Sequence, residues 1–470
     1  MVKMIKKENK SKLNKETKIL IILFVLAFTL RIFLTTCYYW DELVYLQHAD
    51  ILSGKVDNYN EFEFRPPLLS IIIFELYLIW HNPLIANLFV SFLAALSVVF
   101  IYLAAKEMFN KRVGLIAALL LTFWQVHIYF SKTLLVHTTA MLFALIFLFL
   151  IKKAENNPKS WLFFSAGVFL SLAIITRFTY LVLLPIVLIN IILFWKKYNL
   201  KRILAFVLGG VIILSPYLIW AYLNYGNPLH TFEMARLITD WSSKEPWHFY
   251  LSTIPVILGV VGILGLFLWL FYTIKNKKVG KQEILLILWI LLPLFYLSLM
   301  PHKEIRFLLI TLPPIVMFSS IGFRTLYEKI ENKKTLSKIF LISLSVVILI
   351  SANLPYNPYP RTCNSDPQLA SAWIMNNTAQ TDVIYTQEEF PALAYYTDRR
   401  IILAPFDKTR FLDTKNEYMN QPGYYVYFEM QNKTESFPKI EELNKDPRLK
   451  LIKTLNNIDK IYLYQYTPLN

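Results

Sequence analysis

The chain has 470 residues, 56% of them hydrophobic, and a mean hydropathy of +0.44. This balance excludes an ordinary water-soluble enzyme. The net charge of +16 does not indicate a nucleic-acid-binding protein here, because the basic residues gather between long apolar runs, as they do in the cytoplasmic loops of membrane proteins.

Eleven apolar runs are candidates to cross a hydrocarbon core of about 30 Å, so we expect a polytopic α-helical membrane protein. A further run at 68–80 rises only about 20 Å as a helix, which is too short to cross. We therefore expect the first outer loop, residues 37–83, to hold interfacial helices. The eleven runs are 19–36, 84–105, 113–130, 134–151, 161–176, 178–195, 203–220, 251–274, 284–300, 308–326 and 339–354.

Clusters of lysine and arginine predict the orientation. If the run at 68–80 does not cross, the amino terminus and every later basic cluster fall on the cytoplasmic side, whereas a crossing would move the later clusters outside. We therefore predict a cytoplasmic amino terminus, carried by an uncleaved signal-anchor, and an extracytoplasmic carboxyl terminus, in the plasma membrane. The clusters lie at 3–18, 106–112, 152–159, 196–202, 275–281 and 329–338.

The first outer loop carries two adjacent acids directly beyond the first run, Asp41 and Glu42, in YYWDELVYLQHAD. A carboxylate there can act as general base towards a hydroxyl, provided that it lies within hydrogen-bond reach of the proton. The alternative is an ordinary solvated carboxylate, or one paired with Arg31 at the end of the first run.

Later in this loop, Arg65 precedes two prolines in FRPPLLSIIIF. The prolines fix the start of the interfacial helix and hold Arg65 near the lipid headgroups. A guanidinium there suits a phosphate, which it can bind through two parallel hydrogen bonds. The alternative is an anchor for lipid headgroups.

Two further outer segments carry cationic groups. Arg177, in ITRFTY, is either a snorkelling anchor or a second phosphate or sugar contact. The short turn PHKEIRF holds His302, Lys303, Glu304 and Arg306, which is more charge than a helical hairpin turn needs. We expect this turn to bind an anion, with Glu304 orienting Lys303 or Arg306. A structural salt-bridge cluster would explain the acid but not the excess of cationic groups.

After residue 354 the composition changes, so we expect a transmembrane domain at 1–354 and a small extracytoplasmic α/β domain at 355–470. Helical patterns lie at 365–377 and 437–446. The two cysteines, Cys37 and Cys363, both fall outside the membrane, and no feature supports a disulfide between them. Five segments rich in β-branched and aromatic residues predict strands at 382–386, 399–405, 423–429, 449–455 and 460–466.

The acid, the arginine and the cationic turn are all predicted on one side of the membrane. This suits group transfer from a lipid-linked phosphate, which would bind among Arg65, Lys303 and Arg306 while Asp41 takes the acceptor's proton. The leaving phosphate needs charge stabilisation more than protonation, so these cations can serve without a metal. No histidine or cysteine cluster has metal-ligand spacing, and we expect no metal or other cofactor.

Five features of the chain are shared with a known fold: the WDE loop, the RPPL segment, the YGNP segment, the many spans and the outer carboxyl-terminal domain. In these features the chain resembles the GT-C fold glycosyltransferases. The resemblance is strongest to glycosyltransferase family 39 and the aminoarabinose-transferase-like group. HKEIRF is similar to the H-K-E-x-R-F signature of mannosyltransferases that extend dolichol-linked glycans and GPI anchors. The resemblance implies Asp41 as catalytic base with Glu42 beside it, and donor-phosphate contacts at Arg65 and within 302–306.

The resemblance also implies an inverting transfer of mannose or a similar hexose from a polyprenyl- or dolichyl-phosphate donor to a glycan, lipid or protein acceptor. Many members carry a second acid in the next outer loop, where this chain reads SKTLLVH and offers Lys132 and His137. The alternative is a polytopic transporter or a flippase for lipid-linked saccharides, which would favour internal repeats and broken helices near the midplane. Here the charged groups lie at the outer edge.

Overall fold

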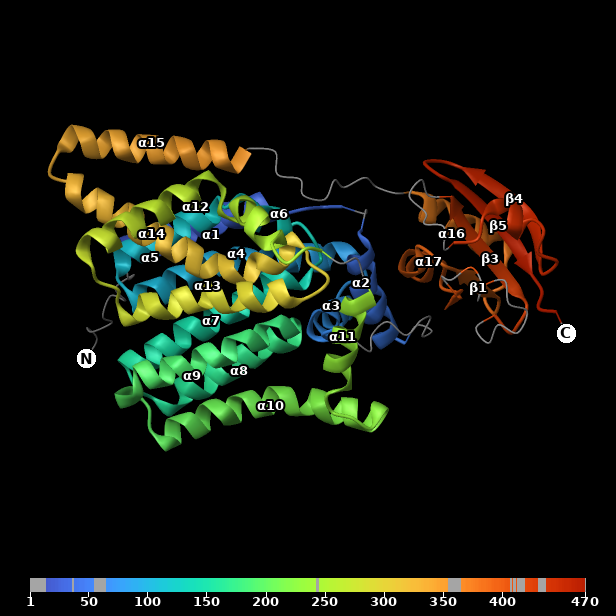
Figure 1. The fold of residues 1–470 in the computed structure, drawn as a ribbon, viewed down its shortest axis with the longest axis horizontal. Coiled ribbons are helices and arrows are strands. Elements are labelled where there is room, and N and C mark those ends of the chain that lie inside the picture. Colours follow the sequence, from blue (N-terminus) through green and yellow to red (C-terminus); the bar gives the residue numbers. More distant parts are fainter. Residues whose placement is uncertain are drawn as a thin grey trace, which may run out of the picture.

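The computed structural model describes residues 14–35, 38–54, 65–241, 245–353, 365–405, 408, 411, 419–429 and 437–469. These residues form a long helical bundle and a small sheet domain beyond one end of it (Figure 1). The predictions for Cys37, for Cys363 and for a domain boundary at 354 fall outside the described residues.

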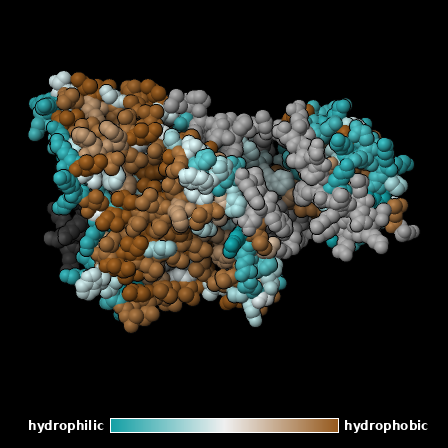
Figure 2. Space-filling model, viewed as in Figure 1, coloured by the Kyte–Doolittle hydropathy of each residue, from teal (hydrophilic) through white to brown (hydrophobic). Residues whose placement is uncertain are grey.

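The bundle helices coincide with the apolar runs, and Figure 2 shows apolar side chains over most of this face of the bundle. Seven stretches of the described chain are long and apolar enough to cross a membrane. The chain is therefore a multi-pass integral membrane protein, while the number of eleven spans stays a prediction. The elements are α1 (Lys15–Arg31), α4 (Pro83–Met108), α5 (Lys111–Thr122), α6 (Gln125–Phe130), α7 (Val136–Asn156), α8 (Ser160–Thr176), η2 (Phe178–Val182), α9 (Leu183–Leu193), η3 (Trp195–Lys197), α10 (Leu200–Tyr225), α12 (Phe249–Asn276), α13 (Lys281–Leu299), η4 (Ile305–Thr311), α14 (Leu312–Ile330) and α15 (Lys334–Asn353).

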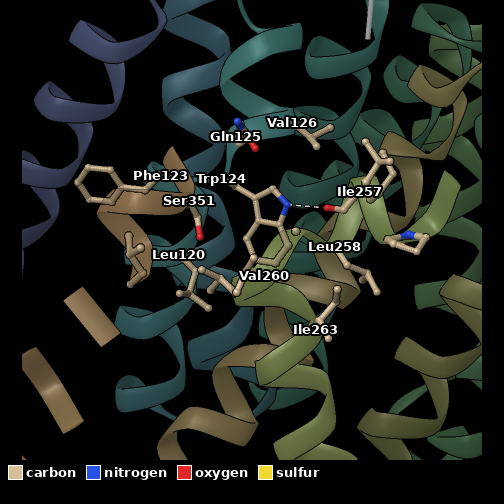
Figure 3. A pocket seen from close by; sticks show the side chains of 15 residues that line it. Leu120, Phe123, Trp124, Gln125, Val126, Ile257, Leu258, Val260, Ile263 and Ser351 are labelled. Carbon is tan, nitrogen blue, oxygen red and sulfur yellow. Dashed lines mark hydrogen bonds between the residues drawn. The ribbon is translucent and has the colours of Figure 1, made fainter. Parts of the chain in front are cut away.

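The predicted run at 113–130 is two helices, α5 and α6, and the break between them faces a second break in α12. Gly259 of α12 has a φ of 58°, which glycine adopts without strain. The indole of Trp124, between α5 and α6, donates a hydrogen bond of 2.9 Å to the carbonyl of Ile257 (Figure 3). Buried backbone groups need partners in apolar surroundings, so the breaks stabilise each other. A largely apolar cavity of about 280 Å³ lies beside them.

Three further helices lie where the bundle meets the sheet domain: α2 (Trp40–Leu52), α3 (Leu68–Tyr77) and α11 (His230–Trp241) (Figure 1). Helix α3 has ten residues and rises about 15 Å, so this helix is too short to cross. That length agrees with the prediction that the run at 68–80 does not span.

The carboxyl-terminal domain is a five-stranded sheet in the order β2-β1-β3-β5-β4. Strand β1 is parallel to β2 and β3, and β5 is antiparallel to β3 and β4. All five predicted strands are present within a few residues, whereas α17 was not predicted. The elements are α16 (Asp366–Asn377), β1 (Val383–Thr386), α17 (Phe390–Thr397), β2 (Arg400–Leu403), β3 (Gly423–Glu429), α19 (Ile440–Leu443), β4 (Leu449–Asn456) and β5 (Lys460–Tyr466).

Helix α17 packs against α2 and joins the two parts of the molecule. The rings of Trp40 and Phe390 meet edge to face, with their centroids 4.4 Å apart. Val44 is fully buried and belongs to the same apolar cluster as Ile374, Leu393 and other residues of the sheet domain. The sheet domain therefore contacts one side of the helix that carries Asp41.

Candidate active site

A cavity of about 470 Å³ lies at the end of the bundle nearest α2, α3 and α11. It brings together side chains that are far apart in the sequence, from the start of α2 to η4. Four arginines and two carboxylates line it, so its described lining carries an excess of positive charge. The charged and histidine side chains are Asp41, Arg65, His137, Arg177, Arg236, His302, Glu304 and Arg306.

Asp41 is held by one arginine on each carboxylate oxygen. Its Oδ1 lies 2.8 Å from Nη2 of Arg65, and its Oδ2 lies 2.7 Å from Nη1 of Arg306. Burial by itself would raise the pKa of Asp41, but the two guanidinium groups outweigh it and hold this pKa well below its usual range. With both arginines in place, Asp41 is ionised and is a weak base.

The turn before η4 orients Arg306 with a second carboxylate. Nη2 of Arg306 donates a hydrogen bond of 2.5 Å to Oε1 of Glu304, and Nε2 of His302 lies 3.0 Å from the same oxygen. Burial alone would raise the pKa of Glu304, but the bond from His302 and the charge of Arg306 lower it to about 2. Arg306 therefore bridges two carboxylates.

Arg177 differs from Arg65 and Arg306 in its neighbours, which are a histidine, a hydroxyl group and an aromatic ring. Its Nη1 lies 2.6 Å from Nε2 of His137, its Nε donates to Oγ1 of Thr179 at 3.0 Å, and its guanidinium lies 4.6 Å from the ring centroid of Phe307. Burial and the nearby charge of Arg306 lower the pKa of Arg177. Within the described part of the chain, no carboxylate lies within 4 Å of this guanidinium. Arg177 is therefore well placed to bind an anion that enters the cavity.

Three residues predicted from the sequence lie outside the lining of this cavity. Glu42 is fully buried, and its two oxygens accept the backbone N–H groups of Tyr39 and Leu134, each at 2.7 Å. Lys303 is 5% exposed and donates to the backbone carbonyls of Glu245 and Met300. These contacts indicate that Glu42 and Lys303 stabilise the fold. They do not support the catalytic role predicted for Glu42 or the phosphate-binding role predicted for Lys303.

Arg31 is the third. It is fully buried and donates to the carbonyls of Leu121 and Thr122, and its Nε lies 3.1 Å from Nδ1 of His127. The alternative in which Arg31 pairs with Asp41 is therefore wrong. Arg31 instead fastens α1 to the end of α5 and to α6.

Two further cavity residues, Tyr45 and Arg236, were not predicted as site residues from the sequence. Tyr45 lies one helical turn after Asp41, and the guanidinium of Arg65 lies 5.8 Å from its ring centroid. Arg236 lies on the amphipathic helix α11, whose apolar periodicity in HTFEMARLITDW was the available signal. Among the described residues, no three histidine, cysteine, aspartate or glutamate side chains gather as a metal site.

Several solved structures of other proteins share this fold. ArnT from Cupriavidus metallidurans, bound to undecaprenyl phosphate, has a TM-score of 0.67 at 11% identity, with 96% of this chain and 97% of that chain covered. The Archaeoglobus fulgidus oligosaccharyltransferase tethered with an acceptor peptide has a TM-score of 0.60 at 14% identity, with 88% and 69% covered. At these identities the likeness is one of fold, and it confirms the expected GT-C architecture.

One curated relative is GPI mannosyltransferase 3 of Candida glabrata, 30% identical over 128 residues. The match covers 26% of this chain and 21% of that enzyme, so it spans about a fifth of the relative's length. The model of the Alg9-like mannosyltransferase family matches residues 65–392, which include Arg65, Arg177 and the turn at 302–306. This family gives no support to the transporter or flippase alternative. Because the match covers well over half of the sequence, the chain belongs to the Alg9-like mannosyltransferase family.

Proposed function

We propose that the protein is an inverting glycosyltransferase that moves mannose or a similar hexose from a polyprenyl or dolichyl phosphate to a hydroxyl of a glycan, lipid or protein. Its membership of a mannosyltransferase family supports the sugar. The observation that carries the proposal is the meeting of Asp41 with four arginines in one cavity of about 470 Å³. The undecaprenyl phosphate bound by ArnT, which has the same fold, supports a lipid-linked phosphate as the donor class.

In the proposed reaction, the donor phosphate binds at Arg177, and Arg65 and Arg306 complete its surroundings. Asp41 accepts the proton of the acceptor hydroxyl while that oxygen forms a bond to the anomeric carbon. The bond from this carbon to the phosphate oxygen breaks, and its electron pair stays on the phosphate, whose charge changes from −1 to −2. The arginines stabilise that added charge. A single displacement from the opposite face inverts the anomeric centre.

The reaction is proposed to take place on the extracytoplasmic face of the plasma membrane. Basic side chains at the other end of the bundle support this orientation, since Lys106 and Lys111 pair there with Glu16 of α1. The sheet domain and the cavity then both lie outside the cell, and the amino terminus lies in the cytoplasm. We also propose that transfer needs no metal. Full activity after dialysis against a chelator is the expected result, and activity restored by a divalent ion would contradict it.

The test uses the full-length protein in membranes with a radiolabelled polyprenyl-phosphate mannose and measures label transferred to glycans. Asp41→Asn keeps the shape of the side chain but removes the base, so transfer is expected to fall by about 10²- to 10⁴-fold. Glu75→Gln is the matched control, because Glu75 is an exposed acid of α3 in the same outer loop. Undiminished transfer by Asp41→Asn would remove the assigned base, and no transfer by the natural sequence would remove the proposed function.

A further inference from the structure

In the proposed function, the two arginines that contact Asp41 also bind the donor phosphate. Arg65 and Arg306 are each bonded to one oxygen of Asp41, and both also line the cavity that receives the donor phosphate. The same two guanidinium groups can therefore bind either the Asp41 carboxylate or the donor phosphate. An acceptor hydroxyl also needs an oxygen of Asp41 that is free to take its proton.

We propose that Arg65 and Arg306 restrain Asp41 until the donor phosphate draws them away, so that donor binding prepares the base and precedes deprotonation of the acceptor. This inference rests on the proposed function for the identity of the phosphate. It adds an order of events, donor first and acceptor second.

The donor phosphate can bind in two steps, first by addition at Arg177 and then by exchange at the ion pairs of Asp41. Arg177 makes no carboxylate contact within the described chain, so an arriving phosphate meets it without displacing an ion pair. The remaining phosphate oxygens can then bond to Arg306, because the guanidinium groups of Arg177 and Arg306 lie 4.6 Å and 5.9 Å from the same ring centroid, that of Phe307, and both line the cavity. A phosphate accepts several parallel hydrogen bonds from guanidinium groups and competes well with a carboxylate for them.

The exchange changes Asp41 because its pKa depends on two opposing effects. Burial raises this pKa, and the charges of Arg65 and Arg306 lower it further than burial raises it. Tyr45 and Glu304 also face Asp41 closely enough to feel its charge. When one arginine turns to the phosphate, its lowering effect on this pKa is lost, so the pKa rises and Asp41 becomes a stronger base. Each rise of one pKa unit is a tenfold gain in its affinity for a proton.

The reverse exchange explains how Asp41 loses, at the end of the cycle, the proton that it took from the acceptor hydroxyl. Transfer leaves Asp41 protonated and the lipid phosphate at a charge of −2. This phosphate binds the arginines more strongly than the donor phosphate did, because the donor phosphate carried a charge of −1. When this phosphate leaves, Arg65 and Arg306 return to Asp41 and favour its ionised form, so the proton passes to water. The free enzyme is thereby restored to the state that the structure describes.

Infrared difference spectroscopy of the full-length protein tests the proposal. The C=O band of protonated Asp41 is identified as the band missing from Asp41→Asn, and its midpoint is measured by acid titration with and without decaprenyl phosphate. The midpoint is expected to rise by about two pH units, or about a hundredfold in proton affinity, when the lipid phosphate is bound. Inorganic phosphate is the second probe. A rise with both probes assigns recognition to the phosphate alone, and a rise with the lipid only shows that the tail is also needed.

Two site variants and one control variant complete the experiment. Arg306→Gln removes one restraint and is expected to raise the midpoint without any phosphate, and Arg65→Lys, which keeps its charge, is expected to raise it less. Glu75→Gln is expected to leave it unchanged. A midpoint that stays the same or falls when lipid phosphate binds overturns the restraint, even where sugar transfer proceeds normally. A raised midpoint in a protein that transfers no sugar would support the restraint and remove the proposed function instead.

Discussion

Replacing Arg177 by glutamine is expected to lower kcat/KM for the lipid-linked donor by about 10- to 100-fold. Within the described chain Arg177 has no carboxylate partner, so its loss breaks no ion pair and leaves the pairs of Asp41 intact. A hydrogen bond to a charged group contributes about 1.5–3 kcal/mol, and about 1.4 kcal/mol corresponds to a tenfold change. The phosphate gains charge as the sugar leaves, so most of the loss is expected in kcat and less in KM.

The assay is the initial rate of mannose transfer at varied donor concentration, with the acceptor held constant. Arg177→Lys keeps the charge but not the planar pair of donors, so we expect an intermediate loss. Arg324→Gln is the control, because Arg324 pairs with Glu328 on α14 and lies outside the cavity. If Arg177→Gln behaves like this control, to within about twofold, Arg177 is a membrane anchor and the assignment of the phosphate is wrong.

Three further predictions concern the surroundings of this site. Glu42→Gln is expected to lower the thermal unfolding midpoint more than Asp41→Asn does, because glutamine can satisfy only one of the two backbone N–H groups that Glu42 accepts, at a cost of about 1–3 kcal/mol; equal midpoints would contradict this. Phe390→Ala leaves a gap beneath Trp40 and is expected to reduce kcat with little change in donor KM, and an unchanged kcat would show that α17 does not position α2. Glu304 has a pKa of about 2 in the folded protein against an ordinary 4.5, so its stabilising contribution is complete above pH 4.5 and is lost as the pH falls towards 2. The thermal midpoints of the natural sequence and Glu304→Gln are therefore expected to converge in acid, and a constant difference would refute this.

The meeting of Asp41, Arg65 and Arg306 could be predicted from the sequence because each lies next to an apolar run. The positive-inside pattern places the ends of these apolar runs on the same side of the membrane. The three side chains are therefore expected at the same depth, close to the outer membrane surface. The sequence does not indicate which neighbouring side chain faces the cavity. Glu42 was assigned as the neighbour of Asp41, and Lys303 as one of the cationic groups of the turn at 302–306. Their side chains instead contact backbone groups. Arg236 was missed because no helix was predicted for its segment, HTFEMARLITDW, which forms the amphipathic α11.

The turn angle of α2 explains both the correct and the wrong assignments, because neighbours on an α-helix point about 100° apart. Asp41 and Tyr45, four residues apart, share the side that faces the cavity. Trp40 and Val44, also four residues apart, share the side that packs on the sheet domain. Glu42 lies on a third side and accepts the N–H group of Leu134. The position of the proposed base is therefore fixed from three directions, by the sheet domain, by the segment before α7 and by the arginines, and the arginines are the contacts that a phosphate can compete for.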